Sequence, residues 1–309
     1  MDYPHKPVMV NEVLDHLITD KGGIYVDGTT GSGGHSEAIL SSLSEKGRLI
    51  CLDRDPDAIS LSRTRLNDPR VSFVRANFAD MGTALKDLRI DKASGILLDL
   101  GMSTYQLDQS GRGFSFSRDE RLDMRMDKEG DTTAEDIINR FSMYDIEKIL
   151  KDYGEEKRAR AISRLIDAER RKGHITTTLQ LAGMIRSIAP HSHRPWIKDP
   201  ATRTFQALRI AVNRELESLE RFLQAAPSLV GHRGRLVLLT YHSLEDRAVK
   251  RAFSDWEKTC VCPPGLPECV CGKKSLFIRV NRKIIKPSAG EIQDNPRARS
   301  ATLRAAERI

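Results

Sequence analysis

The sequence lacks any long hydrophobic run. No apolar stretch in its 309 residues approaches the roughly eighteen that cross a membrane, and Met1–Lys6 has no apolar core of a secretion signal. Cysteine is scarce: there are five, and four of them lie between residues 260 and 271. These absences argue against a membrane protein and against a disulfide-stapled secreted scaffold. We therefore expect a protein of the reducing cytoplasm that has no membrane partner.

Acidic residues are sparse in the C-terminal quarter. Residues 232–309 carry 16 lysines and arginines against 8 aspartates and glutamates, whereas residues 1–100 carry 12 against 15. The whole chain has a formal net charge of +7. A basic quarter beside a near-neutral region indicates a polyanionic substrate such as nucleic acid. The plainer alternative is a solvated surface.

Glycine gathers in one short segment, between Asp27 and Ser36. There an apolar run gives way to a helical pattern, which predicts a strand, a turn and a helix N-terminus that a ligand approaches closely. A second apolar run ends at Asp53, about twenty residues on, where doubly wound folds bind a ribose diol. The dinucleotide fingerprint fails because Ser36 replaces its third glycine. Asp27 favours a cationic ligand without phosphate, such as S-adenosylmethionine; the alternative is a turn whose glycines serve packing alone.

Strand and helix signals alternate over residues 24–100, stop, and return near residue 234. This rhythm predicts an α/β protein with a Rossmann-like sheet and an inserted helical domain. We expect a long loop over 101–130, helices within 132–190 and one amphipathic helix from Thr204 to Leu223. Expected strands are 24–27, 48–52, 71–74, 95–99 and 234–241, with two closing strands at 275–280 and 283–285.

Ligands bind such sheets at the carboxyl ends of the strands. That rule brings Asp27, Asp53, Asp99 and the segment Tyr241–Ser243 to one rim, with Phe78 nearby. Asp99 is the best candidate to contact the reacting group. Phe78 either stacks on an adenine or packs in the core, and within Tyr241–Ser243 we expect His242 to begin a helix rather than act as an acid or base.

Arginine and phenylalanine interleave within Gly111–Arg118, as in loops that stack bases and bind phosphates, although an ordered lid has the same composition. The tail Asn295–Arg304 adds three arginines, or is a surface helix or packing segment.

The four clustered cysteines form two C-x-C pairs around prolines. They predict either a structural zinc site, which four thiolates would close completely, or reduced thiols on a rigid loop. These candidate ligands are Cys260, Cys262, Cys269 and Cys271.

Eight blocks, in order along nearly the whole chain, resemble the family of bacterial 16S ribosomal RNA cytosine-N4 methyltransferases, the small-subunit methyltransferase H family. They are Asp27–Ser36, Leu52–Pro56, Leu98–Gly101, Arg112–Phe116, Leu122–Met126, Pro200–Gln206, His242–Arg247 and Asn295–Ser300. The resemblance implies S-adenosylmethionine as donor and a decoding-region cytosine of 16S rRNA as acceptor. The partner is then 16S rRNA or the small ribosomal subunit, with no indication of oligomeric state.

The resemblance also assigns residues. It implies a cofactor site at Gly33, Gly34, His35, Asp53, Phe78, Asp99 and Gln106. It implies a helical substrate-recognition insertion, residues 105–212, between two parts of the methyltransferase domain, 1–104 and 213–309. Within that insertion the candidate substrate-binding residues are Arg112, Phe114, Phe116 and Arg203.

Many amino-methyltransferases carry an Asp/Asn/Ser-Pro-Pro-aromatic motif after the fourth strand. In this chain the corresponding segment, Asp99–Met102, has the sequence Asp-Leu-Gly-Met and departs from that motif. The proton acceptor is therefore unassigned. No cysteine lies in Asp99–Tyr105 to attack the pyrimidine ring, which favours direct transfer to N4 over covalent C5 chemistry. Because a base inside a duplex cannot reach a buried methyl donor, we expect the target cytosine to be unpaired or flipped. Two alternatives are a small-molecule methyltransferase and a non-catalytic RNA-binding assembly factor with the same fold.

Overall fold

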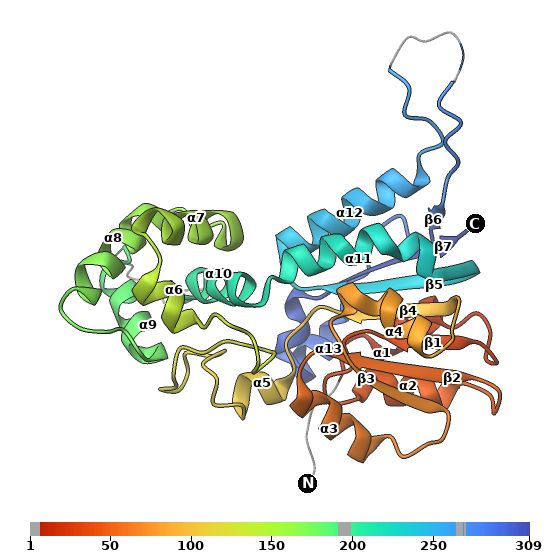
Figure 1. Cartoon of the computed structure of the whole chain (residues 1–309), viewed down its shortest axis with the longest axis horizontal. Helices are drawn as coiled ribbons and strands as arrows, with labels where there is room; N and C mark the ends of the chain where they lie inside the picture. Colours follow the sequence, from red (N-terminus) through yellow and green to blue (C-terminus); the bar gives the residue numbers. More distant parts are fainter. Residues whose placement is uncertain (1–6, 191–198, 264–267, 269) are drawn as a thin grey trace. The chain divides into compact units, whose positions relative to one another are not determined.

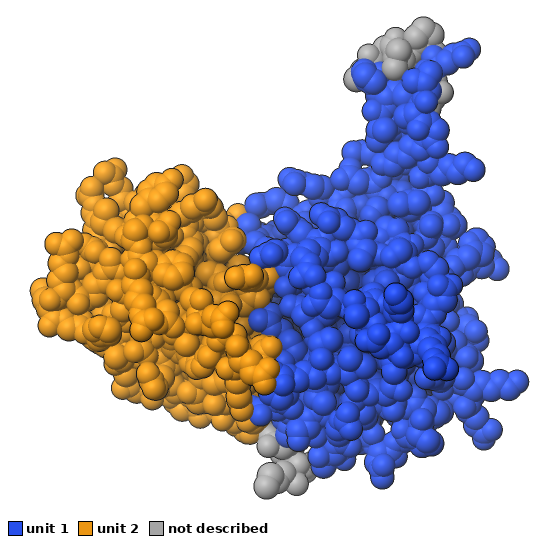
Figure 2. Space-filling view, viewed as in Figure 1, with its two compact units in different colours: residues 1–101, 216–309 blue, residues 102–215 orange. Residues whose placement is uncertain are grey.

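The computed structural model describes residues 7–190, 199–263, 268 and 270–309. The chain divides into two compact units (Figure 2). The first, which we call the sheet unit, comprises residues 1–101 and 216–309; the second, the helical unit, comprises residues 102–215. The boundaries predicted from the sequence, after residues 104 and 212, each differ from these by three residues.

A seven-stranded sheet of order β3-β2-β1-β4-β5-β7-β6 forms the centre of the sheet unit (Figure 1). Strands β1 to β5 run parallel, whereas β7 is antiparallel to both β5 and β6. This is the Rossmann-like architecture predicted from the alternating pattern. The strands are β1 (Ile24–Asp27), β2 (Arg48–Asp53), β3 (Val71–Arg75), β4 (Ala93–Asp99), β5 (Val230–Thr240), β6 (Phe277–Arg279) and β7 (Thr302–Arg308).

Both faces of the sheet are buried, which is why its central strands are almost wholly apolar. Along β4, Ile96 and Leu98 belong to the core under α4, α11 and α12, whereas Leu97 belongs to the core under α1 and α2. The helices of this unit are α1 (Val10–Leu17), α2 (Gly34–Ser42), α3 (Pro56–Arg65), α4 (Met81–Asp87), α11 (Glu215–Leu229), α12 (Ser243–Glu257) and α13 (Ala289–Asp294), with 3-10 turns η1 (Phe78–Asp80) and η2 (Pro296–Ser300).

The helical unit has a hydrophobic core of its own, built from five of its helices and from the loop that precedes them. Its helices are α5 (Thr104–Asp108), α6 (Ala134–Arg140), α7 (Met143–Gly154), α8 (Ala159–Arg170), α9 (Thr178–Ser187) and α10 (Thr202–Asn213). Within the described part of the chain, no helix has the length and apolar character that a bilayer crossing requires.

Three sequence-based expectations need correction. The single helix expected from Thr204 to Leu223 is two helices, because Arg214 takes a left-handed conformation with φ of 48° between α10 and α11. In the expected strand 283–285, Ile285 forms only an isolated bridge to Leu303. The closing strand is instead β7, in the basic tail, and the loop over 101–130 contains the short helix α5.

Candidate cofactor and catalytic site

Three aspartates end neighbouring parallel strands. Asp27 ends β1, Asp53 ends β2 and Asp99 ends β4, and β1 pairs with both other strands. The carboxyl ends of parallel strands lie at one edge of the sheet, so the three carboxylates share the rim predicted from the sequence.

The glycine-rich loop leaves β1 and enters α2 through Gly33, which has a left-handed φ of 85°. A side chain at Gly28 would lie 2.4 Å from Leu98 Cδ2, so glycine is required where the loop crosses β4. Asp27 is fully buried and accepts hydrogen bonds from Ser36 Oγ at 2.6 Å and Thr29 N at 3.2 Å. Its carboxylate therefore braces the loop from within.

Asp53 keeps acceptor capacity for a ligand. Its Oδ2 accepts from Gly31 N and its Oδ1 from Asp55 N, both at 2.9 Å. A carboxylate offers about four acceptor positions, so each oxygen retains one, as a ribose diol needs. Burial raises the pKa of Asp53 to about 6, although the bonds from Asp55 and Gly31 act in the opposite direction.

Asp99 is held from several sides. Its backbone N–H donates to Thr29 Oγ1 at 2.6 Å, and its Oδ1 accepts from Gly101 N at 3.3 Å. Burial alone would raise the pKa of this carboxyl, but the His35 ring and the Tyr241 hydroxyl outweigh it and hold the pKa below the ordinary value. Burial and the Asp99 charge raise the pKa of Tyr241 well above its usual range. The pair is therefore a carboxylate and a protonated phenol at neutral pH.

The rim also contains buried polar atoms that await a partner. Ser32 Oγ and His35 Nδ1 make no hydrogen bond to the described residues, whereas His35 Nε2 faces Asp99 Oδ2 at 3.5 Å. Buried groups of this kind are costly unless a ligand satisfies them. Their position at the start of α2 fits the polar amino-acid end of S-adenosylmethionine, while Asp53 fits its ribose.

Phe78 and His242 were ambiguous in the sequence. Phe78 begins η1, and its half-buried ring meets Phe222 edge-on at 6.0 Å while its Cβ lies close to Gly28. It thus packs on the core beside the glycine loop. His242 caps α12: its Nδ1 accepts from Glu245 N, and Glu245 Oε2 accepts from His242 N. The expected helix-start role of His242 is confirmed.

Sequence reasoning gave no role to Thr29 and Tyr241, both of which contact Asp99. Tyr241 follows β5 directly, and that position was the available signal. A Cβ at Gly101 would lie 2.8 Å from the Tyr241 ring, so this glycine makes room for the tyrosine.

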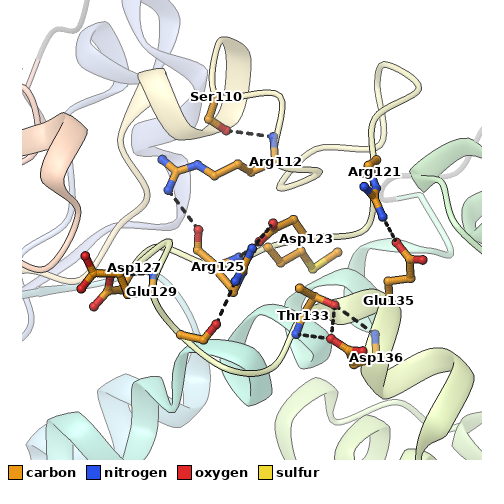
Figure 3. A network of polar contacts seen from close by, with 12 residues as sticks. Ser110, Arg112, Arg121, Asp123, Arg125, Asp127, Glu129, Thr133, Glu135 and Asp136 are labelled. Carbon is orange, nitrogen blue, oxygen red and sulfur yellow. Dashed lines mark hydrogen bonds and ion pairs between the residues drawn. The ribbon is translucent and has the colours of Figure 1, made fainter.

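In the helical unit, Arg112 of the segment Gly111–Arg118, which we call the Arg/Phe loop, bonds to the backbone of the segment that follows this loop (Figure 3). Arg112 is 7% exposed, and its guanidinium donates to the carbonyls of Arg125 and Met126, both at 3.0 Å. Phe114 is buried in the core of the unit, and the Phe116 ring packs on Phe205 at 4.7 Å. These side chains hold the loop together rather than lying open to bases.

A bidentate ion pair fixes the following segment (Figure 3). Arg125 donates through Nε and a terminal nitrogen to the two carboxylate oxygens of Asp123, at 2.9 and 2.8 Å. Between them Met124 adopts a left-handed φ of 59° and is fully buried. Asn213 bonds to Met124 O and Met126 N, which ties this strained segment to the end of α10.

The remaining candidates of the helical unit differ in exposure. Gln106 is buried in α5, where its side chain accepts from Ser103 N and completes a capping box. Arg203 is exposed on α10 and donates to Glu155 O at 3.0 Å.

Three of the four cysteines converge. The sulfurs of Cys260, Cys262 and Cys271 lie within 4.8 Å of one another, and those of Cys260 and Cys271 are 3.9 Å apart. Cys269 lies outside the described residues. Two backbone N–H groups, of Cys262 and Val261, donate to the Cys260 and Cys271 sulfurs at 3.3 and 3.4 Å.

Comparison with known proteins identifies the family of the chain. The model of the MraW methylase family matches residues 2–309. Ribosomal RNA small subunit methyltransferase H of Desulfosudis oleivorans is 47% identical, with 100% of both chains covered. The protein of the same name from Lachnospira eligens is 44% identical over 100% of this chain and 99% of its own. The structure of TrmN from Thermus thermophilus aligns with a TM-score of 0.43 at 13% identity, over 97% of this chain and 48% of that one. The chain belongs to the MraW methylase family.

Proposed function

We propose that the protein transfers a methyl group from S-adenosylmethionine to N4 of a cytosine in the decoding region of 16S rRNA, acting in the cytoplasm on the free rRNA or the small subunit. Its full-length relatives are named as rRNA small subunit methyltransferases. The observation that carries the chemistry is the Asp99 carboxylate, held ionised by His35 and Tyr241 at the end of the strand beside the glycine loop.

The cofactor-binding residues divide by chemistry. Asp53 accepts from the ribose hydroxyls with its two remaining acceptor positions. Ser32 and His35, with the backbone of Gly33 and Gly34, hold the amino-acid end, and Phe78 borders the adenine. The assignment of Gln106 to the cofactor rests on the family resemblance alone. When bound, the cofactor supplies an electrophilic methyl group on a sulfonium.

Asp99 orients and stabilises the target amine. The N4 lone pair of cytosine is delocalised into the ring, so the amine must be turned in line with the methyl group as positive charge grows on nitrogen. An Asp99 carboxylate accepts an N4–H and stabilises that charge. Because its pKa is lowered, Asp99 acts as an anionic hydrogen-bond acceptor rather than as the final proton acceptor. Tyr241, which stays protonated, keeps the carboxylate in place.

Substrate binding in the helical unit combines direct and indirect roles. Arg203 is exposed and suits a phosphate contact. Arg112, Phe114 and Phe116 act by shaping the loop that presents exposed Ser117 and Arg118. Replacing the three shaping residues should therefore weaken RNA methylation through loss of loop structure.

We also infer a structural zinc ion held by Cys260, Cys262, Cys271 and Cys269. Tetrahedral zinc with bonds of about 2.3 Å places its sulfurs about 3.8 Å apart, close to the 3.9 Å between Cys260 and Cys271. N–H donors to the sulfurs favour thiolates. Protein purified without chelator should contain about one zinc per chain, less in Cys262→Ser; absence of stoichiometric zinc contradicts the site.

Nucleoside mass spectrometry of 16S rRNA tests the main proposal. Cells that lack the protein should lose N4-methylcytidine from the decoding region, and purified protein with S-adenosylmethionine should restore it on small subunits or rRNA. Formation of 5-methylcytidine would contradict the mechanism. Cofactor binding without any RNA methylation would favour an assembly factor.

A further inference from the structure

A cavity lies at the opposite edge of the sheet from the cofactor rim. It has a volume of about 500 Å³ and is lined where β4 and β5 begin. Its ionisable lining residues are Asp20, Lys92, His232, Arg233, Arg235 and Glu307. From Ala93 to Asp99, β4 spans six residue steps, or about 20 Å at 3.3 Å per step. The cavity is therefore separate from the site around Asp99.

An irregular turn of β5 forms one wall of this cavity. Ala93 pairs with Val230 and Gly95 with Arg235, so two steps along β4 match five along β5. The extra residues loop out, and Arg233 takes a left-handed φ of 60° within them. Gly234 closes the base of the loop, because a Cβ there would lie 2.8 Å from Val230 Cγ1. Strained backbone at a cavity points to a binding function.

The basic side chains of the cavity differ in what they already bind. Arg235 is committed to Glu307 at 3.0 Å and to His16 O, and Lys92 donates to Ser228 O. Arg233 and His232 are exposed and have no ion-pair partner among the described residues. The strained loop thus presents an uncommitted guanidinium to an anion.

A carboxylate and the scarcity of rings narrow the ligand. Asp20 is exposed, and its Oδ1 accepts from Gly22 N at 2.8 Å, which leaves acceptor positions for a hydroxyl. Among the described residues of the lining, His232 alone carries a ring, so a base has little to stack on. A guanidinium for phosphate beside a carboxylate for a hydroxyl fits ribose–phosphate, and the 2′-hydroxyl distinguishes RNA from DNA.

We propose that this cavity binds a ribose–phosphate unit of the RNA backbone, at a distance from the methylated base. The inference rests on the proposed RNA substrate. Such a contact anchors the RNA without reading its sequence, because phosphate and sugar contacts position a nucleic acid and base contacts specify it.

Binding of a short uridine-rich RNA, and of DNA of matched sequence, to the full-length protein tests this site. Arg233→Asn removes the charge but tolerates the left-handed conformation. It should lower the slope of log affinity against log salt by about 1. Lys46→Asn is the matched control, since Lys46 is exposed near the same edge but outside the cavity. Equal slopes in the two variants overturn the proposal.

Asp20→Asn tests the sugar contact. It retains the bond from Gly22 and should narrow the preference for RNA over DNA; an unchanged preference contradicts the ribose assignment.

In an NMR titration, the His232 ring resonances should shift with RNA, and inorganic phosphate should compete. If the His232 resonances shift with phosphate but not with RNA, the cavity is a small-anion site and the proposal is overturned. Unchanged S-adenosylmethionine affinity verifies the fold. The proposed function is tested separately, by whether the wild-type protein forms N4-methylcytidine in 16S rRNA.

Discussion

The glycine loop and the Arg/Phe loop both contain residue types that suggest binding, but their polar side chains differ in whether they already have hydrogen-bond partners. In the glycine loop, Ser32 and His35 are buried with polar atoms that lack partners among the described residues. In the Arg/Phe loop, the Arg112 guanidinium already donates to two carbonyls, and the phenylalanine rings pack in the core of the helical unit. Residue type alone therefore does not separate a site from a scaffold; unused hydrogen-bonding capacity does.

The largest expected effect is at Asp99, which we propose to contact both the cofactor and the target amine. Asp99→Ala should abolish turnover, because the other two strand-end carboxylates, Asp27 and Asp53, have raised pKa values and cannot replace it. Asp99→Asn should retain a trace, since an amide oxygen still accepts a hydrogen bond. Single-turnover methylation of small subunits measures both. Full activity in Asp99→Ala would remove Asp99 from the mechanism.

The comparison between the loops predicts a stability effect at Arg112. Arg112→Met should lower the free energy of unfolding of the protein by about 2–4 kcal/mol, because two half-buried carbonyls lose a charged donor and a buried side chain is repacked. Arg121→Met is the control: Arg121 is 78% exposed and forms an ion pair with Glu135, so its loss should change stability by less than about 0.5 kcal/mol. Loss of RNA binding in Arg112→Met at unchanged stability would make the loop a direct site.

Asp53 should matter for binding rather than for folding. Asp53→Ala should cost about 1.5–3 kcal/mol of S-adenosylmethionine affinity, or about ten- to hundredfold, through lost charge-assisted bonds. Asp91→Ala, at an exposed position before β4, should leave the affinity unchanged. Calorimetry on both variants decides, and unchanged affinity in Asp53→Ala refutes the ribose contact.

The raised pKa of Asp53 gives a pH dependence. Its value of about 6 exceeds the ordinary 3.8, so the folded protein holds this proton more tightly than the unfolded chain. The contribution of the group to stability is thus present below pH 4 and is lost as the pH rises through 6. Cofactor affinity follows the opposite course, because binding needs the carboxylate: it should fall about tenfold from pH 7 to pH 5. A flat profile contradicts this role, and Asp53→Asn should be flat.

The smallest effect sharpens the comparison most. Ser32→Ala removes an unpartnered hydroxyl, so without cofactor the protein should be as stable or more stable by up to about 1 kcal/mol, while S-adenosylmethionine affinity falls. Ser94→Ala should instead destabilise, because Ser94 Oγ accepts from Ile24 N. Thermal melts with and without cofactor measure both. Destabilised, normally binding Ser32→Ala would make Ser32 part of the scaffold.

Much of the sheet could be predicted because its strands are short apolar runs between glycine and aspartate. Asp53 and Asp99 followed from the rule that such strands end at the ligand. Strand β7 was hidden because Ala305 and Ala306, two of its buried positions, are not typical strand formers. The break at Arg214 was hidden because apolar periodicity continues on both sides of it.

The contacts around Asp99 lay beyond sequence reasoning. Tyr241 and Thr29 reach it from other strands, and no local pattern states that Gly101 makes room for a ring. Arg112 is a second such case. The sequence shows a guanidinium that could bind RNA, but only the structure shows that it donates to the carbonyls of Arg125 and Met126.

The insertion also separates in time two strands that are adjacent in space. β4 ends at Asp99 and its neighbour β5 begins at Val230. At about 5–20 residues per second, synthesis of the intervening segment takes on the order of ten seconds. During that interval the apolar edge of β4 has no partner on one side. Folding of the helical unit shortens the effective loop that β5 must close, so the insertion that interrupts the sheet also governs how soon it is completed.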